Sequence, residues 1–386
     1  MNYDVMFVGG SYPMPTGGGS VNYVERLLSK VEGFSYMVLT SDTNPNDNKE
    51  FDEKRHCLTK RSKYIYHVLK SYKGSWLKKR LFLIIAIFQT VFCVLKYRPK
   101  MIFFTEFSSL AFSLYIIKLF CGAKIGLFTY AEEITQLKND QNLGNLFKST
   151  LLKSDIIITV CDYTANILNS YCNVKGKTEK IVPSIICNKA DKIIKNKDNG
   201  EIVLLTVARL EQRKGHCRVL DVMGELIGQF PEIHYNIVGT GPYEKVIKSD
   251  IERKGLSSNV HLLGKLSDAD LKWQYENADI FVMPHIELEN GDTEGCPTVF
   301  LEAGSYCLPV IGGDAGGVSD AIIHGQTGYI CNHNQNGDLY NYLLELIKNK
   351  DLREKMGKAG HDYSQQFSVE KQSAKFSEIV VNTLNK

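Results

Sequence analysis

Short apolar runs alternate with amphipathic stretches along most of the chain. Continuous apolar runs predict parallel strands covered on both faces, and apolar residues spaced every three or four positions predict helices. The predicted strands lie at 4–8, 101–104, 124–129, 156–160, 203–208, 235–238, 260–263, 280–283 and 308–312. The predicted helices lie at 21–31, 108–120, 144–153, 216–229, 243–254, 267–277 and 368–384. This alternation predicts an α/β protein of the doubly wound kind.

The alternation stops in the polar stretch 186–200 and then begins again. A chain of 386 residues is also too long for one ordinary core. We therefore predict two doubly wound domains, the first over 1–190 and the second over 198–368.

Composition is that of a soluble globular protein, with 44% apolar residues, 23% charged residues and a net charge of +3. Ten cysteines form neither a C-x-x-C pair nor a Cys/His cluster with metal-ligand spacing. Their scatter predicts reduced thiols in a cytosolic protein without a zinc site. The first residues run directly into a strand and a glycine turn, so no signal peptide is expected.

Charge is distributed unevenly. The region 54–100 contains thirteen Lys or Arg and no Asp or Glu, and an apolar run at 81–95 lies within it. That run is short for a membrane span. Either it is a buried helix behind a solvated basic loop, or 54–95 docks on an anionic membrane surface. No nucleic-acid-binding module accompanies the basic residues, so a nucleic-acid partner is not expected.

The stretch 291–304 has the features of a ligand site. Pro297 suits the first position of a helix, which leaves amide groups from about Thr298 onward facing the preceding loop. Such a helix end favours a phosphate. Glu302 lies one turn deeper than Thr298 and is flanked by apolar residues, so its carboxylate needs a hydrogen-bond partner. A ligand hydroxyl would supply that partner.

Two cations follow the first strand of the second domain. Arg209 and Lys214 lie in the loop after 203–208, at the edge of a parallel sheet where ligands bind. An ordinary solvated loop is the alternative to an anion-binding site.

Two features of the first domain also follow strands. The glycine-rich loop around Gly18 and Gly19 permits close approach of backbone to a phosphate, although a plain flexible connection is an equal alternative. The turn at 130–134 carries Glu132 and Glu133 beside Tyr130. Adjacent carboxylates there would contact substrate, unless they are simply acidic residues at the start of a helix.

The second half closely resembles the retaining glycosyltransferases called family 4. The matching motifs are Thr206-Val-Ala-Arg-Leu210 with Lys214-Gly215, Ile237-Val-Gly-Thr-Gly-Pro242, Val260-His-Leu-Leu-Gly264, Ala278-Asp-Ile-Phe-Val-Met-Pro284, Glu294-Gly-Cys-Pro-Thr-Val-Phe-Leu-Glu-Ala303, Gly316-Gly-Val-Ser-Asp-Ala-Ile322 and Gly325-Gln-Thr-Gly328. The spacing of Glu294 and Glu302 is the most specific of them. The first half resembles the family only in its opening strand, glycine loop and acidic turn.

The resemblance implies a GT-B fold, in which two Rossmann-like domains face a cleft and the last helix, 369–386, returns to the first domain. A nucleotide-sugar donor would lie on the second domain. By position, Glu302 would bind the ribose hydroxyls, Glu294 would contact the donor sugar, and Arg209 with Lys214 would hold the diphosphate. The remaining donor contacts implied are Pro297, Thr298, Val299, Leu263, Gly264, Gly18 and Gly19.

The implied chemistry needs no cofactor and no metal. Two cations and a helix end would stabilise the nucleoside diphosphate as it leaves, and no aspartate-based magnesium site is recognisable. Family members often carry a histidine in the acidic turn, where this chain has Tyr130 or Ala131. Glu132 or Glu133 would then do the acceptor-side work.

The sequence therefore predicts transfer of a sugar to a hydroxyl of a glycan or lipid-linked acceptor. The expected setting is bacterial surface polysaccharide synthesis, in the cytoplasm and peripheral on the inner face of the cell membrane. A nucleotide-sugar 2-epimerase on the same fold and a non-catalytic subunit that binds a sugar nucleotide are the alternatives. Base, sugar, acceptor and linkage are not distinguished by these residues.

Overall fold

The chain forms two compact units, one of Met1–Ser184 with Val369–Lys386 and the other of Ile185–Ser368. This computed structural model describes residues 2–9, 19–42, 52–53, 57–65, 76–130, 141–188, 200–332 and 336–386. The units divide just before the polar stretch 186–200, most of which lies outside the described residues.

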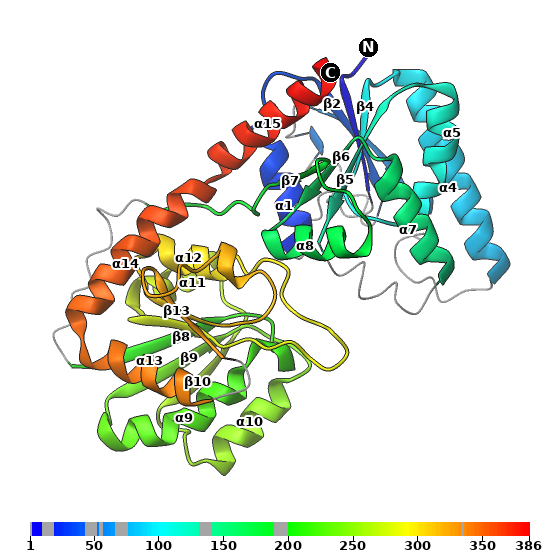
Figure 1. The fold of residues 1–386 in the computed structure, drawn as a ribbon. Helices are drawn as coiled ribbons and strands as arrows, with labels where there is room; N and C mark the ends of the chain where they lie inside the picture. The colour runs from blue at the N-terminus through cyan, green and yellow to red at the C-terminus, as the bar shows by residue number, and fades with distance from the viewer. Residues whose placement is uncertain are drawn as a thin grey trace. The chain divides into compact units, whose positions relative to one another are not determined.

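The first unit is built on a parallel sheet of seven strands in the order β3-β2-β1-β4-β5-β6-β7. The strands are β1 (Val5–Val8), β2 (Tyr36–Ser41), β3 (Leu58–Ser62), β4 (Met101–Phe104), β5 (Lys124–Thr129), β6 (Ile156–Thr159) and β7 (Thr178–Lys180). The central strands are buried on both faces because helices cover the sheet on each side (Figure 1).

The helices of the first unit include one from the far end of the chain. They are α1 (Gly19–Leu28), α4 (Trp76–Tyr97), the 3-10 turn η1 (Ser109–Phe112), α5 (Ser113–Phe120), α7 (Gln141–Lys153), α8 (Asp162–Tyr171) and α15 (Val369–Asn385). Helix α15 lies beside α1 (Figure 1), where the Ser373 hydroxyl donates to the Leu27 carbonyl oxygen at 2.7 Å. The last helix therefore completes the first domain, as the resemblance implied.

Helix α4 contains the apolar run 81–95. Its inner side chains Ala86, Thr90 and Val94 are fully buried, whereas six large apolar side chains on its outer face are exposed. The interpretation as a buried helix is therefore correct for one face only. Among the described residues, one segment, Arg80–Tyr97, is long and apolar enough to cross a membrane by length and composition.

The second unit has a parallel sheet of six strands in the order β10-β9-β8-β11-β12-β13. The strands are β8 (Ile202–Val207), β9 (Ile233–Val238), β10 (Val260–Gly264), β11 (Ile280–Met283), β12 (Val310–Gly313) and β13 (Gly328–Cys331). The order reverses between β8 and β11, and the carboxyl ends of strands at such a switch point are where open α/β sheets bind ligands.

Helices flank this second sheet on both sides (Figure 1). They are α9 (His216–Gln229), α10 (Glu244–Arg253), α11 (Asp268–Asn277), α12 (Val299–Ser305), α13 (Asn336–Lys348) and α14 (Lys350–Ser364), with 3-10 turns η3 (Gln212–Lys214), η4 (Val318–Asp320) and η5 (Gln365–Phe367). The loops after β8 and β11 carry the charged residues that the sequence singled out, and the strand order places these loops next to each other.

Candidate functional site

The loop after β8 is pulled against the end of β11. Gly215 has a φ of +76°, and a Cβ at this position would lie 2.1 Å from the Pro284 carbonyl oxygen. Any other residue would therefore push the two loops apart. The same junction is closed by the Ile286 amide, which donates to the Arg213 carbonyl oxygen at 2.8 Å. Glycine at 215 thus lets the cations of one loop meet the carboxylates of the other.

Lys214 and Glu294 form an ion pair at this junction. The Lys214 Nζ lies 2.5 Å from Glu294 Oε1, and each side chain is only 12% exposed. Arg213 also donates to Glu294 through Nη1. The structure therefore brings Lys214 and Glu294 into direct contact, which the sequence analysis did not predict, and adds Arg213 as a third partner that it missed.

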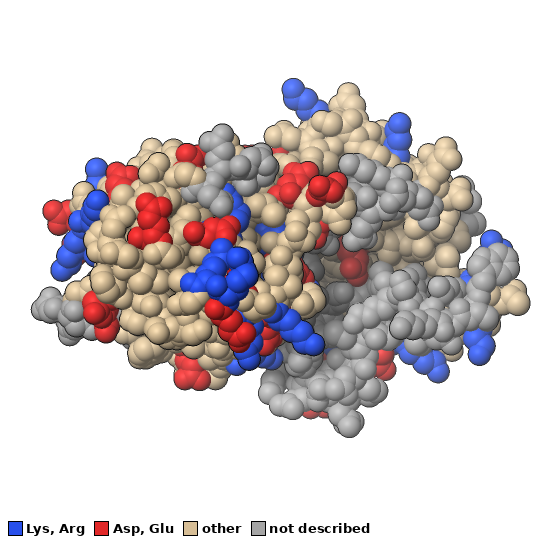
Figure 2. Space-filling view, turned by 90° about the horizontal axis from the view of Figure 1, so that it is seen from below, with Lys and Arg blue, Asp and Glu red and all other residues tan. Residues whose placement is uncertain are grey.

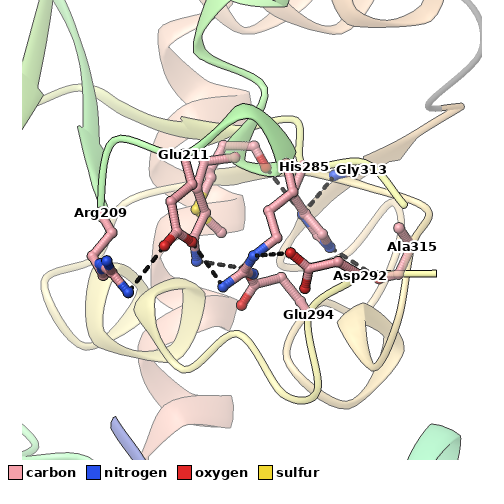
Figure 3. A network of polar contacts seen from close by, with 10 residues as sticks. Arg209, Glu211, His285, Asp292, Glu294, Gly313 and Ala315 are labelled. Atoms are coloured by element: carbon pink, nitrogen blue, oxygen red, sulfur yellow. Dashed lines mark hydrogen bonds and ion pairs between the residues drawn. The ribbon is translucent and has the colours of Figure 1, made fainter. Parts of the chain in front are cut away.

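Besides Glu294, Arg213 contacts two further carboxylates of these loops. Its Nη2 lies 3.1 Å from Glu211 Oε2 and its Nε lies 3.5 Å from Asp292 Oδ2; both of these carboxylates are labelled in Figure 3. Arg209, which is 73% exposed, reaches the other oxygen of Glu211 at 3.0 Å. The sequence signal for Arg213 was its place beside Lys214 in a loop at a sheet edge, but a residue in such a loop is usually solvated.

Burial changes the pKa of the Lys214 amine. It lowers the pKa of Lys214 to about 7, and the charge of Arg213 acts in the same direction, while Glu211 and Asp292 oppose both. The Glu294 carboxylate at 2.5 Å also favours the charged amine. The Lys214 ammonium therefore depends on anionic neighbours, and a bound phosphate would stabilise its charged form.

Acidic and basic side chains of the described residues lie interspersed on the face shown in Figure 2. Ion pairs elsewhere in the second unit, such as Lys254 with Asp221, follow the same pattern. Lys214, Arg213 and Glu294 form what we call the cluster around Lys214. Their side chains are largely shielded from solvent, so their charges interact more strongly than those of surface ion pairs do.

His285 fixes the neighbouring glycine turn. Its ring is fully buried, with Nε2 2.9 Å from the Ala315 carbonyl oxygen and Nδ1 accepting from the Gly313 amide at 3.3 Å (Figure 3). Nδ1 also lies 3.2 Å from the Met283 carbonyl oxygen. Burial lowers the pKa of His285 to about 4. The neutral ring therefore holds the turn 312–317 beside Glu294.

The start of α12 differs from the prediction. Thr298 is the N-cap, so Pro297 precedes the helix rather than opening it. The Thr298 amide donates to the Cys296 carbonyl oxygen at 3.0 Å and the Phe300 amide to the Pro297 carbonyl oxygen at 3.3 Å. These two amides are already bonded, which leaves Val299 as the donor expected nearest the loop.

Glu302 is half-buried on α12, one turn beyond Thr298. It lies close to the buried Tyr275, whose pKa is raised well above its ordinary value, first by burial and then by the Glu302 carboxylate. On the edge strand β10, Leu263 and Gly264 are the last two residues, at the carboxyl edge of the sheet. All the donor-side residues predicted in the second domain thus lie on that edge or in the segments following it.

The predicted residues of the first domain are only partly described. Gly19 is the first residue of α1, and the Tyr130 hydroxyl donates to the Thr105 carbonyl oxygen at 2.9 Å. Gly18, Glu132 and Glu133 lie outside the described residues.

Among the described residues, one group with metal-ligand geometry was found, Glu201, Glu232 and His234. Glu201 and Glu232 immediately precede β8 and β9. They therefore lie at the amino edge of the sheet, opposite the cluster around Lys214.

Solved structures share this architecture over nearly the whole chain. Sucrose-phosphate synthase of Thermosynechococcus elongatus aligns with a TM-score of 0.77 and 18% identity, covering 99% of each chain. Anabaena HepE in complex with UDP aligns with a TM-score of 0.75 and 15% identity, covering 99% of this chain and 100% of that one. The fold is therefore that of the GT-B glycosyltransferases, with two parallel-sheet Rossmann-like domains.

The second unit also matches a sequence family. Residues 188–363 match the family model described as Glycosyl transferases group 1. This match covers the loops after β8 and β11 and the whole of α12, so it includes the ion-pair cluster.

Three curated relatives match shorter parts of the chain. An uncharacterized glycosyltransferase of Methanocaldococcus jannaschii is 28% identical over 235 residues, 61% of this chain and 62% of the relative. The amylovoran biosynthesis glycosyltransferase AmsK of Erwinia amylovora is 32% identical over 149 residues, 37% of this chain and 35% of the relative. A GDP-mannose-dependent monoacylated alpha-(1-6)-phosphatidylinositol monomannoside mannosyltransferase of Corynebacterium glutamicum is 33% identical over 159 residues, 41% of each chain. The chain thus spans between 35% and 62% of these relatives' lengths.

Proposed function

We propose that the chain is a retaining glycosyltransferase of the family 4 type, which moves a sugar from a nucleotide diphosphate donor to a hydroxyl group. The observation that carries this proposal is the convergence of Lys214, Arg213 and Glu294 at the switch point of the second sheet. Ligands of open α/β sheets bind at such points. The shielded Lys214 ammonium, with Arg209 in the same loop, suits a diphosphate.

The donor would lie along the carboxyl edge of the second sheet. Lys214 and the exposed Arg209 would hold the diphosphate, and Glu302 would accept hydrogen bonds from the ribose hydroxyls. Leu263 and Gly264 would meet the base with their backbone. The UDP bound by the structurally similar HepE supports a nucleotide donor of this kind.

Donor binding would require an exchange of ion-pair partners. A phosphate oxygen would replace Glu294 on Lys214, while Arg213 keeps its contact with Glu294. The carboxylate of Glu294 would then stay directed at the donor sugar without neutralising the phosphate-binding cation.

The chemistry follows from where charge develops. As the bond from the anomeric carbon to the phosphate oxygen breaks, its electron pair moves to the diphosphate, and fixed cations stabilise that charge. The acceptor hydroxyl attacks the same face and transfers its proton to the departing phosphate. This route retains the anomeric configuration without a protein nucleophile, unlike hydrolysis by paired carboxylates, and requires no metal or other cofactor.

The acceptor proposed is a glycan or a lipid-linked glycan. Support comes from two relatives whose names specify amylovoran biosynthesis and a phosphatidylinositol mannoside acceptor. Tyr130, Glu132 and Glu133 remain the acceptor-side residues proposed, and Gly18 with Gly19 the contacts to the donor from the first domain. The cytoplasmic location at the inner face of the cell membrane stays a prediction.

The test is a transfer assay combined with nucleotide binding. We expect Lys214→Ala and Glu302→Ala to abolish transfer while the protein stays folded, because both side chains would contact the donor. Glu289→Ala, an exposed carboxylate in the loop after β11, is the control and should stay active. A thermal-shift panel of UDP, GDP, ADP and their sugars would identify the base, since a specific ligand stabilises the folded protein.

Full transfer activity in Glu302→Ala would contradict the donor-site assignment. An epimerase would instead convert the donor when no acceptor is present. A non-catalytic subunit would bind nucleotide tightly without turnover against any acceptor. The presence of Glu294, Glu302, Arg209 and Lys214 in the chain argues against that outcome.

A further inference from the structure

Exposed apolar side chains are concentrated on one side of the first unit. Of thirteen large apolar side chains exposed among the described residues, ten belong to α4, to η1 with α5, and to α7. Isolated apolar side chains on a surface are ordinary, but a contiguous group marks a contact surface.

Six of the ten form a line along α4, which we call the apolar stripe. Successive members are three or four positions apart, and this spacing places them on one face of a helix. Their exposed fractions run from 50% to 71%. The apolar stripe consists of Leu77, Leu81, Ile84, Phe88, Phe92 and Leu95.

The opposite face of α4 is fixed to the sheet. Ala86, Thr90 and Val94 are fully buried, and the Ser62 hydroxyl at the end of β3 donates to Gln89 Oε1 at 2.5 Å. The helix therefore cannot leave the domain to cross a bilayer without exposing that core. The apolar stripe is the outer surface of a packed helix, and it extends about 27 Å at 1.5 Å per residue.

Cations border the apolar stripe. Lys78, Arg80 and Lys96 are exposed on α4, which contains no Asp or Glu. The Lys96 ammonium lies 6.0 Å from the centre of the Phe92 ring. On α7, Lys153 lies 3.4 Å from the centre of the Tyr115 ring, itself one of the exposed aromatic residues of α5. Apolar side chains edged by cations suit an anionic lipid surface, where the former enter the acyl boundary and the latter meet phosphates.

We propose that α4 docks lengthwise on an anionic phospholipid membrane through the apolar stripe. The helix lies in the interface plane, the side chains of the stripe enter the acyl boundary, and Lys78, Arg80 and Lys96 contact lipid phosphates. The proposal narrows the predicted membrane surface of 54–95 to one helix face with a defined orientation. It stands apart from the proposed transfer activity, because docking needs neither donor nor acceptor.

The first experiment is flotation of the full-length protein with vesicles of phosphatidylglycerol and phosphatidylcholine, or of phosphatidylcholine alone. We expect the wild type to float with the anionic vesicles and to bind neutral ones more weakly. The triple variant Leu81→Gln, Phe88→Gln and Phe92→Gln should lose about tenfold or more in partitioning, because it removes half of the stripe's apolar side chains. Its melting temperature should stay near that of the wild type, since the three side chains are exposed.

A matched variant controls for the general loss of apolar surface. Val246→Gln with Trp273→Gln alters two side chains of the second unit that are 45% and 57% exposed, and its partitioning should be unchanged. Equal flotation of wild type and triple variant would overturn the proposal. So would a wild-type dimer that the triple variant converts to monomer without any vesicle binding, because a second copy would then cover the apolar stripe.

The orientation is tested with single tryptophans. In a background with Trp76→Phe and Trp273→Phe, Leu81→Trp, Phe88→Trp and Leu95→Trp place a probe near each end and at the middle of the stripe. Lipids brominated at a shallow acyl position should quench all three equally if the helix lies flat. Unequal quenching, with the Phe88→Trp probe quenched more strongly than the Leu81→Trp and Leu95→Trp probes, would contradict flat docking.

Discussion

At the scale of single residues, Arg213 links more of the site than any residue chosen from the sequence. It contacts the carboxylates of Glu211, Asp292 and Glu294. A guanidinium can do this because its five N–H donors lie in one plane and point in different directions. Its role in the proposed reaction would be to position Glu294 rather than to touch the reacting atoms.

We predict that Arg213→Ala lowers kcat/KM by about 10- to 100-fold, because Glu294 loses a charged hydrogen-bond partner worth roughly 1.5–3 kcal/mol. Arg213→Lys should recover only part of this loss, since a lysine cannot reach several carboxylates at once. Steady-state kinetics with the donor identified by thermal shift measure the effect. Arg253→Ala, which removes an exposed arginine on α10, should behave like the wild type. If Arg213→Ala left both the donor affinity and the rate of transfer unchanged, Arg213 would not position Glu294.

At the scale of elements, the turn 312–317 is held against the loop after β11 by close backbone contact. Gly316 has a φ of +59°, and a Cβ there would lie 1.8 Å from the Glu294 carbonyl oxygen. Gly325 has a similar φ of +75°, but a Cβ there meets nothing within 4 Å. A substitution at Gly325 therefore reports the cost of the left-handed backbone alone. A substitution at Gly316 reports that cost together with a steric clash at Glu294.

We predict that Gly325→Ala costs about 1–2 kcal/mol of folding free energy through its left-handed backbone alone. Gly316→Ala should cost more and should also weaken donor binding, because the added methyl group displaces Glu294. Chemical denaturation gives the two stability changes, and nucleotide thermal shifts give the binding change. Equal effects of the two substitutions on donor binding would show that the contact at Gly316 does not position the site.

The elements predicted from periodicity agree with the structure where the pattern is strong. The strands at 101–104, 124–129 and 280–283 and the helix at 216–229 have the predicted bounds. Strands β2, β3, β7 and β13 were not predicted. β3 and β7 are short and polar, so their strand conformation depends on pairing with a neighbour that a local pattern does not reveal.

At the scale of the whole molecule, the first unit is closed by residues from opposite ends of the chain. Phe376 on α15 is fully buried among the rings of Phe7, Phe103 and Phe128, with centroid distances between 5.4 and 6.2 Å. The last helix is therefore part of the core of the first domain.

We predict that Phe376→Ala destabilises the first unit by about 3–5 kcal/mol, the usual cost of removing a buried aromatic side chain. Hydrogen exchange should rise in β1, β4 and β5 and change little in β8 and β9, because the two units have separate cores. Lys375→Ala, an exposed neighbour on the same helix, should leave both sets of strands protected. Increased exchange in the second unit alone would contradict this assignment of the helix.

The sequence by itself determined the alternation of strands and helices, the division into two domains, and the grouping of Arg209, Lys214, Glu294 and Glu302 at one sheet edge. These follow from local periodicity and from the rule that ligands bind at the carboxyl ends of parallel strands. Only the tertiary structure decided that Arg213 joins the carboxylates and that α4 exposes one apolar face. The run at 81–95 is apolar nearly all round, so its pattern could not reveal which face the sheet covers.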